Sequence, residues 1–143
     1  MGAKSNNLKV LSDNTPDWMH VPESICLPFK LMEHCLAACD PQGNNRIVRL
    51  IRRLTRTKKV DMMAARLLKC KKIILNLSYE RAIQNDQTLR ELKQGLANFG
   101  ITDFPKAWRA IKRVWASKFN ERAFLAMKKL GASLSQVYMA VLI

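Results

Sequence analysis

A glycine turn at the start of the chain has residue types that can hold phosphate oxygens. Gly2, Ala3, Lys4 and Ser5 precede a predicted short helix that runs to Ser12. Backbone amides and a lysine near a helix N-terminus favour a bound anion, because the N–H donors and the helix dipole both attract negative charge. The turn is not a Walker A motif, since G-x-x-x-x-G-K-[ST] is absent. Phosphate binding at Lys4 is therefore one hypothesis, and a solvated lysine is the alternative.

A second stretch, VWASKFNERAF at residues 114–124, sets charged side chains among large apolar ones. Lys118 and Arg122 are four residues apart, so in a continuous helix they would lie on the same side. These charges are either a solvated helix surface, with pairing between Glu121 and its neighbours, or part of a binding site. Spacing alone leaves both interpretations open.

Four cysteines and two histidines are the residues with metal-binding potential. Cys35 and Cys39 would share a helical face, and His34 precedes the first of them. Zinc sites usually combine two such pairs into a tetrahedron, and the only other histidine is His20, so we expect no metal site. The sequence shows no secretory signal, and the chain is long enough to fold without disulfides, so we expect reduced thiols.

Positive charge is concentrated in one segment of the chain. The formal net charge is +14 at pH 7. Residues 46–72 contain eleven basic side chains and a single acidic one, Asp61, and so carry ten of the fourteen excess charges. Such a surface attracts polyanions, such as nucleic acid, anionic lipid or phosphorylated ligands, without selecting among them. A solvated helix face is an equally good interpretation.

Hydrophobic periodicity predicts a series of helices that would position these residues. Pro28 suits the first position of the first helix, and Gly100 suits a left-handed residue at the C-terminal end of the fourth. Trp108, Trp115 and Phe119 recur at helical spacing in the last helix and are expected in the core. The predicted helices span residues 28–39, 46–59, 61–78, 79–100 and 106–131.

Two apolar segments, residues 23–27 and 136–143, predict strands. The fold class expected from these elements is α+β and helix-dominated. A composition of 48% hydrophobic and 25% charged residues, with five Gly and five Pro, excludes collagen-like, low-complexity and wholly disordered classes. The 143 residues fit one domain or part of a larger one, and a strand that ends at the last residue indicates a piece of a larger unit.

The sequence carries no signal for membrane insertion or secretion. No apolar run approaches the roughly 18–20 residues of a membrane span, and the N-terminus lacks the basic and apolar regions of a signal peptide. A cytoplasmic location, or an organelle lumen, is the default expectation.

Two motifs in the same order resemble the ATP-binding domain of the phosphoenolpyruvate synthase and pyruvate phosphate dikinase family. GAKSNNLKVLS followed by VPESICLPF is similar to its opening glycine-rich turn, helix and strand, and AIKRVWASKFNERAF followed by VYMAVLI is similar to a later segment. The α-glucan water dikinases of starch metabolism look most similar, since they share GAKS, the P-x-W loop, LPF and AIK-x-VWASK-x-NERA. The resemblance covers nearly the whole chain and is loosest in the basic middle helices.

This resemblance implies that residues 1–143 are the N-terminal portion of a dikinase ATP-binding domain, the first and incomplete subdomain of an ATP-grasp-like fold. Lys4 matches the lysine of the glycine-rich turn that contacts ATP phosphates, although Ala3 replaces a glycine of the usual motif. Arg122 matches an arginine that also reaches the phosphates, with Ser117 and Lys118 as its neighbours. Arginine suits this task because its planar fork can bind two phosphate oxygens.

The resemblance also implies the reaction and the cofactors, ATP and Mg²⁺. ATP would phosphorylate an enzyme histidine with its β-phosphate, leaving AMP and phosphate, and the phosphoryl group would pass to an α-glucan. The phosphohistidine and the carboxylates that hold magnesium would lie outside this chain, so we expect no catalytic residue or metal ligand within it. Phosphoryl transfer needs both, so the chain alone should be inactive.

Other functions stay open at this point. A pyruvate water or phosphate dikinase, or an antibiotic phosphotransferase, would share the same domain. A basic helical nucleic-acid-binding module is an alternative of a different class, based on residues 46–72, but it lacks a recognisable reader motif. The resemblance adds a plastid location to the default cytoplasmic one, and no contact with a membrane is expected.

Overall fold

Helices dominate the computed structural model, which describes residues 7, 10–19, 24–57, 59–139 and 141–143. This confirms the helix-dominated class. The α-helices are α2 (Leu31–Cys39), α3 (Pro41–Thr55), α4 (Val60–Leu75), α5 (Ala82–Asn85), α6 (Gln87–Asn98), α7 (Phe104–Ser117) and α8 (Glu121–Lys129). The other elements are the strands β1 (Cys26–Leu27) and β2 (Val141–Leu142) and the 3₁₀ helix η1 (Leu134–Gln136).

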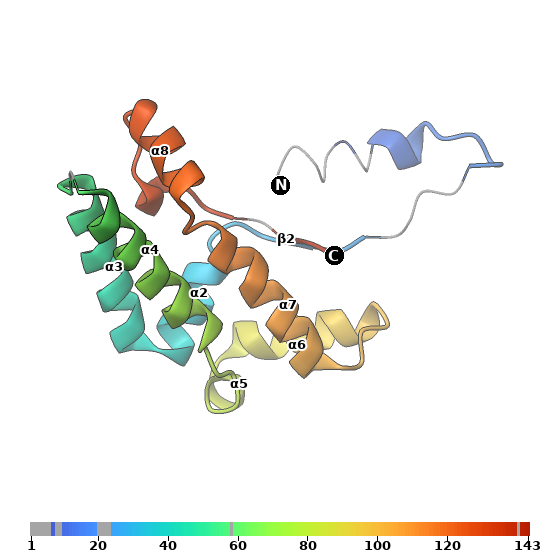
Figure 1. The fold of residues 1–143 in the computed structure, drawn as a ribbon. Helices are drawn as coiled ribbons and strands as arrows, with labels where there is room; N and C mark the ends of the chain where they lie inside the picture. Colours follow the sequence, from blue (N-terminus) through green and yellow to red (C-terminus); the bar gives the residue numbers. More distant parts are fainter. Residues whose placement is uncertain (1–6, 8–9, 20–23, 58, 140) are drawn as a thin grey trace.

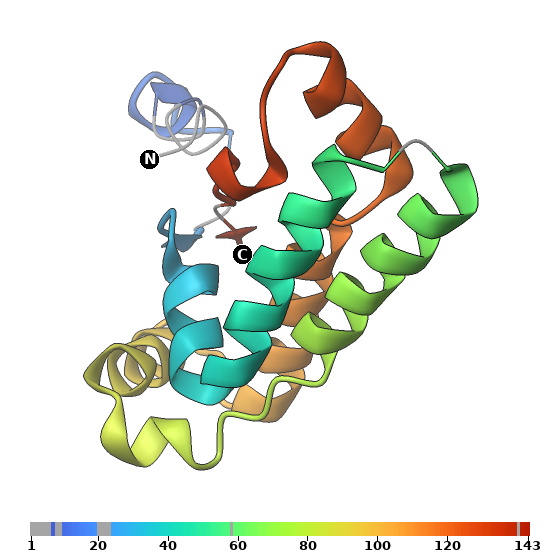
Figure 2. The ribbon, with the colours of Figure 1, turned by 90° about the vertical axis from the view of Figure 1, so that its left-hand side faces the viewer.

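Helix α7 carries the aromatic side chains around which the other helices pack. It lies against α4, which forms an antiparallel hairpin with α3 (Figures 1 and 2). Trp108 and Trp115 on α7, and Phe119 just after its end, are almost completely buried, as their spacing predicts. The two tryptophan rings meet edge to face, with their centroids 5.7 Å apart, an arrangement that aromatic pairs prefer. The apolar side of α7 therefore fixes the positions of its neighbours.

The two predicted strands are real but short. β1 pairs with β2 in an antiparallel ladder in which Cys26 faces Leu142 and Leu27 faces Val141. Ile25 and Ile143 extend the contact by exchanging backbone hydrogen bonds of 2.9 and 3.0 Å. The prediction of a strand over 136–143 is too long, because β2 covers only Val141–Leu142 and Gln136 belongs to η1. The ladder joins segments that are far apart in the sequence.

Two helices begin directly after a capping aspartate, at positions that hydrophobic periodicity did not predict. Asp40 accepts a 2.7 Å hydrogen bond from the Gly43 amide, so α3 begins at Pro41, five residues before the predicted start. Asp86 accepts from the Leu89 amide at 2.9 Å and starts α6, so the single helix predicted over 79–100 is wrong. Aspartate favours this position because its carboxylate satisfies an amide that lacks a partner within the helix.

Two further predictions concern residues at helix ends. Pro28 does not begin α2, because Lys30 adopts a left-handed conformation, with φ of 69°, directly before the helix starts at Leu31. Gly100 does take the expected left-handed conformation, with φ of 87°, after the end of α6. Glycine adopts this conformation without a steric penalty, which explains the stop. Among the described residues, no helix is long and apolar enough to cross a membrane.

Candidate functional site

The NERA motif forms a sharp corner between α7 and α8. The single helix predicted over 106–131 is wrong, because α7 ends at Ser117 and α8 begins at Glu121. The Asn120 side chain accepts a 2.7 Å hydrogen bond from the Ala123 amide and donates a 2.5 Å hydrogen bond to the Ser117 carbonyl. Asn120 therefore satisfies one free backbone group at the start of α8 and one at the end of α7.

Arg122 lies in the first turn of α8, and its side chain is exposed. It has no hydrogen bond or ion pair to any described residue. The first turn of a helix is electrostatically unfavourable for a cation, because the free amides there carry partial positive charge. An anion at this corner would meet both those amides and the guanidinium. The position of Arg122 is thus better suited to a bound anion than to helix stability.

Lys118 has a different environment. It is buried, with 6% of its surface exposed, and its Nζ lies 3.4 Å from Glu33 Oε1 on α2. Burial lowers the pKa of Lys118, and the nearby Glu33 carboxylate opposes that effect. The prediction that Lys118 and Arg122 lie on one side of a helix is wrong, because the corner at Asn120 separates them. Lys118 instead connects the corner to α2.

Ser117 and Lys4 complete the set of residues predicted to contact nucleotide. Ser117 is exposed, and its hydroxyl donates a 2.6 Å hydrogen bond to the Val114 carbonyl one turn earlier. Lys4 lies outside the described residues, so its distance from Arg122 is not part of this structure. The contact of all four residues with phosphate stays a prediction.

The histidine of α2 has a structural partner, and its two cysteines are free thiols. His34 Nε2 lies 2.9 Å from Asp86 Oδ2, which connects α2 to the start of α6. Burial raises the pKa of Cys35 to about 12 and that of Cys39 to about 11. Both thiols are therefore protonated at neutral pH in this structure. Among the described residues, no three His, Cys, Asp or Glu side chains are grouped to hold a metal ion.

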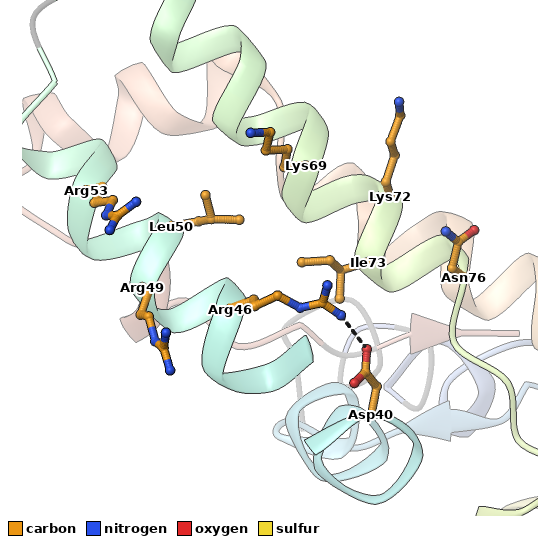
Figure 3. Close-up of a pocket in the computed structure, with 9 residues that line it drawn as sticks. All are labelled: Asp40, Arg46, Arg49, Leu50, Arg53, Lys69, Lys72, Ile73 and Asn76. Atoms are coloured by element: carbon orange, nitrogen blue, oxygen red, sulfur yellow. Dashed lines mark hydrogen bonds and ion pairs between the residues drawn. The ribbon is translucent and has the colours of Figure 1, made fainter. Parts of the chain in front are cut away.

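A basic groove lies between α3 and α4. The charge count in the sequence had identified a basic segment at residues 46–72, but not a groove. The α3–α4 groove has a volume of about 480 Å³ and an apolar base that includes Leu50 and Ile73 (Figure 3). Asp40 is its only acidic lining residue and pairs with Arg46 at 3.3 Å. Five cationic side chains line the groove: Arg46, Arg49, Arg53, Lys69 and Lys72.

The helical spacing explains why these cations line one groove. On α3, Arg46, Arg49 and Arg53 follow an i, i+3, i+7 pattern and therefore share one side of the helix. On α4, Lys69 and Lys72 are three residues apart and also share a side. The hairpin brings these two sides together at the groove, where Arg46, Arg53 and Lys69 reach toward the space between the helices and the tips of Arg49 and Lys72 point away from it (Figure 3). This pattern was visible in the sequence, but the pairing of the two helices was not.

Comparison with known proteins supports the resemblance of the motifs. The whole chain aligns with α-glucan water dikinase 2 of Arabidopsis thaliana at 35% identity over 147 residues, or 11% of that protein. It aligns with the chloroplastic α-glucan water dikinases of Solanum tuberosum, at 32% identity, and Citrus reticulata, at 29%, over 151 residues in each case. The chain thus spans about a tenth of the length of these relatives. No protein-family model and no solved structure matches it.

Proposed function

We propose that this chain, whose full length is homologous to a segment of the α-glucan water dikinases, forms one wall of an ATP site in a phosphotransferase of that type. The observation that carries the proposal is the alignment of the entire chain with these dikinases at 29–35% identity. The exposed guanidinium at the start of α8 supports it, because this position attracts anions. The ATP-grasp-like architecture is part of the same proposal.

In this proposal Arg122 holds phosphate oxygens of ATP, together with Lys4. Asn120 positions Arg122 by starting α8 at the corner, and Ser117 stands on the other side of that corner. Lys118 reaches phosphate only if it leaves Glu33, so its main contribution is to hold α2 against the corner. ATP supplies the phosphoryl group when bound, and this chain's own residues bind and orient its phosphates.

The complete reaction involves parts of the protein beyond these residues. The β-phosphate would pass to a histidine and then to an α-glucan, with Mg²⁺ neutralising the phosphates. The described residues offer no grouped carboxylates for Mg²⁺, so its ligands would come from elsewhere in the protein. The names of the Solanum tuberosum and Citrus reticulata relatives describe them as chloroplastic, and we propose a plastid location for this protein as well.

A chimera tests the function directly. This chain would replace the aligned segment of the Solanum tuberosum enzyme, and transfer of the β-phosphate from labelled ATP to protein and to α-glucan would be measured. Arg122→Gln should weaken ATP binding by about tenfold or more, which is the usual loss for a charged hydrogen bond. Arg109→Gln is the control, because Arg109 is exposed on α7 and lies eight residues before Ser117 and the corner. Equal ATP affinity in the two variants would contradict the role of Arg122.

A further inference from the structure

The α3–α4 groove has features that a solvated surface does not explain. Solvated helices usually carry both signs of charge, often as i, i+4 ion pairs that stabilise the helix. Here Arg49 and Arg53 are four residues apart, and Lys69 and Lys72 are three apart, with no acidic residue between them in the groove. Like charges at these spacings destabilise a helix by about 0.2–0.5 kcal/mol per pair. A bound anion would remove that repulsion.

The charge of the groove is largely unpaired. Arg46 pairs with Asp40, but the side chains of the other four lining cations have no hydrogen bond or ion pair to any described residue. Both helices contribute, so a ligand in the groove would meet cations on two sides (Figure 3). Cations from two helices can contact the same ligand, which favours an anion with several adjacent charges.

The lining selects among anionic ligands. The groove volume of about 480 Å³ lies in the range of small-molecule sites. None of its lining side chains is aromatic, so it offers no surface on which nucleic-acid bases can stack. Five cations against one carboxylate exceed what a single phosphate group can neutralise, since a phosphate monoester carries about −1.5 to −2 charges at pH 7.

From these observations we infer that the α3–α4 groove is a binding site for a chain of two or more adjacent phosphate groups, recognised by cations of both helices. The site is separate from the proposed contact of Arg122 with ATP, because Arg122 does not line the groove. The phosphate chain belongs either to an inorganic polyphosphate or to a nucleoside polyphosphate, and the two share the chemistry that the groove recognises.

Calorimetry with the 143-residue chain and inorganic tripolyphosphate, at near-physiological salt, tests the site. The double variant Arg49→Gln/Lys69→Gln removes one cation from each helix, and it should lower the affinity at least tenfold. Lys72→Gln alone should lower it severalfold and provides a second variant if the double variant folds poorly. The matched control is Lys128→Gln/Lys129→Gln at the end of α8, which removes the same charge and should change the affinity less than twofold. An equal loss of affinity in the control would contradict the proposed site, because it would mean that binding depends only on the net charge of the chain.

Three further titrations separate this site from its competitors. Orthophosphate should bind at least tenfold more weakly than tripolyphosphate, and equal binding would overturn the requirement for adjacent phosphates. With Arg122→Gln in place, which removes the proposed ATP contact at the corner, ATP should match tripolyphosphate in its sensitivity to the groove variants. ATP binding that ignores the groove variants would overturn recognition of the phosphate chain there. A mixed-sequence single-stranded oligonucleotide that binds more tightly than tripolyphosphate, and depends on the same variants, would overturn the proposal in favour of nucleic acid.

The Arg122→Gln variant distinguishes failure of this proposal from failure of the proposed function. It should leave tripolyphosphate binding to the groove unchanged. If Arg122→Gln abolishes binding and the groove variants do not, the anion site is at the corner of α7 and α8, and the groove proposal is wrong.

Discussion

At the scale of single residues, neighbouring cations of one motif have different environments. Lys118 is buried against Glu33, whereas Arg122 is exposed at the start of α8. Their types and separation predicted a shared helix side, because the sequence pattern gives no direct measure of where a helix breaks. The signal that was available is Asn120, a residue that favours the cap position, followed by Glu in the first turn.

The ion pair of Lys118 leads to the first prediction. Glu33→Gln should lower the free energy of unfolding at pH 7 by about 3 kcal/mol, because it leaves a buried ammonium without its counter-charge. The pKa of Lys118 is already lowered by burial, and removal of the carboxylate lowers it further. Chemical denaturation of both proteins at pH 7 measures the difference.

The pH dependence gives this prediction a specific signature. A lysine whose folded pKa is lowered carries its full penalty below that pKa, and the penalty is relieved as the pH rises toward the unfolded value of about 10.4. The deficit of Glu33→Gln should therefore shrink between neutral pH and about pH 10. Glu91→Gln, at an exposed position of α6, should cost little at any pH. A deficit that is constant with pH would mean that Lys118 is not the cause.

At the scale of elements, aspartates mark helix starts that periodicity missed. Asp40, Asp86 and Asp103 each accept a hydrogen bond from the amide three residues later, and helices begin directly after them. This signal is local and was readable in the sequence. The left-handed conformation of Lys30 was not readable in the sequence, because lysine has no intrinsic preference for it.

Gly43 in the first turn of α3 leads to the second prediction. A Cβ atom there would lie 2.1 Å from Asp40 Oδ2 and 3.0 Å from Ile73 Cγ2. Gly43→Ala should therefore force the Asp40 side chain to turn away, which removes the helix cap and the ion pair with Arg46. The expected loss is about 1 kcal/mol of unfolding free energy, typical for a lost cap.

Gly95 in α6 provides the matched control for this substitution. A Cβ atom at Gly95 would meet nothing within 4 Å, so Gly95→Ala should stabilise the helix by up to about 1 kcal/mol. Thermal unfolding of the two variants should therefore shift in opposite directions. Stabilisation by Gly43→Ala would show that the Asp40 cap contributes little.

At the scale of the whole molecule, α4 joins an aromatic core to a basic surface. Its buried residues, among them Leu67, Cys70 and Ile74, pack inward, while Lys69 and Lys72 line the groove. The sequence predicted helices over both segments and located their positive charge, but the contact between the two helices arises only in the fold. Sequence reasoning therefore located the charge and the core separately, and the structure combines them in one hairpin.

This charge distribution leads to the last prediction, which concerns salt. Ten excess positive charges lie on residues 46–72, and Arg46 of this segment pairs with Asp40 at 3.3 Å. The mutual repulsion of the positive charges opposes the folded state and is screened as the Debye length falls from about 30 Å at 0.01 M salt to about 8 Å at 0.15 M. The free energy of unfolding should therefore rise by about 1 kcal/mol when potassium chloride increases over this range, as measured by thermal unfolding.

Arg49→Gln/Lys69→Gln should start from a higher stability at low salt and gain less from added salt, whereas Lys128→Gln/Lys129→Gln should change both quantities less. This comparison between variants cancels the general effect of salt on apolar burial, so an equal salt response in all three proteins would exclude repulsion across the hairpin as the cause.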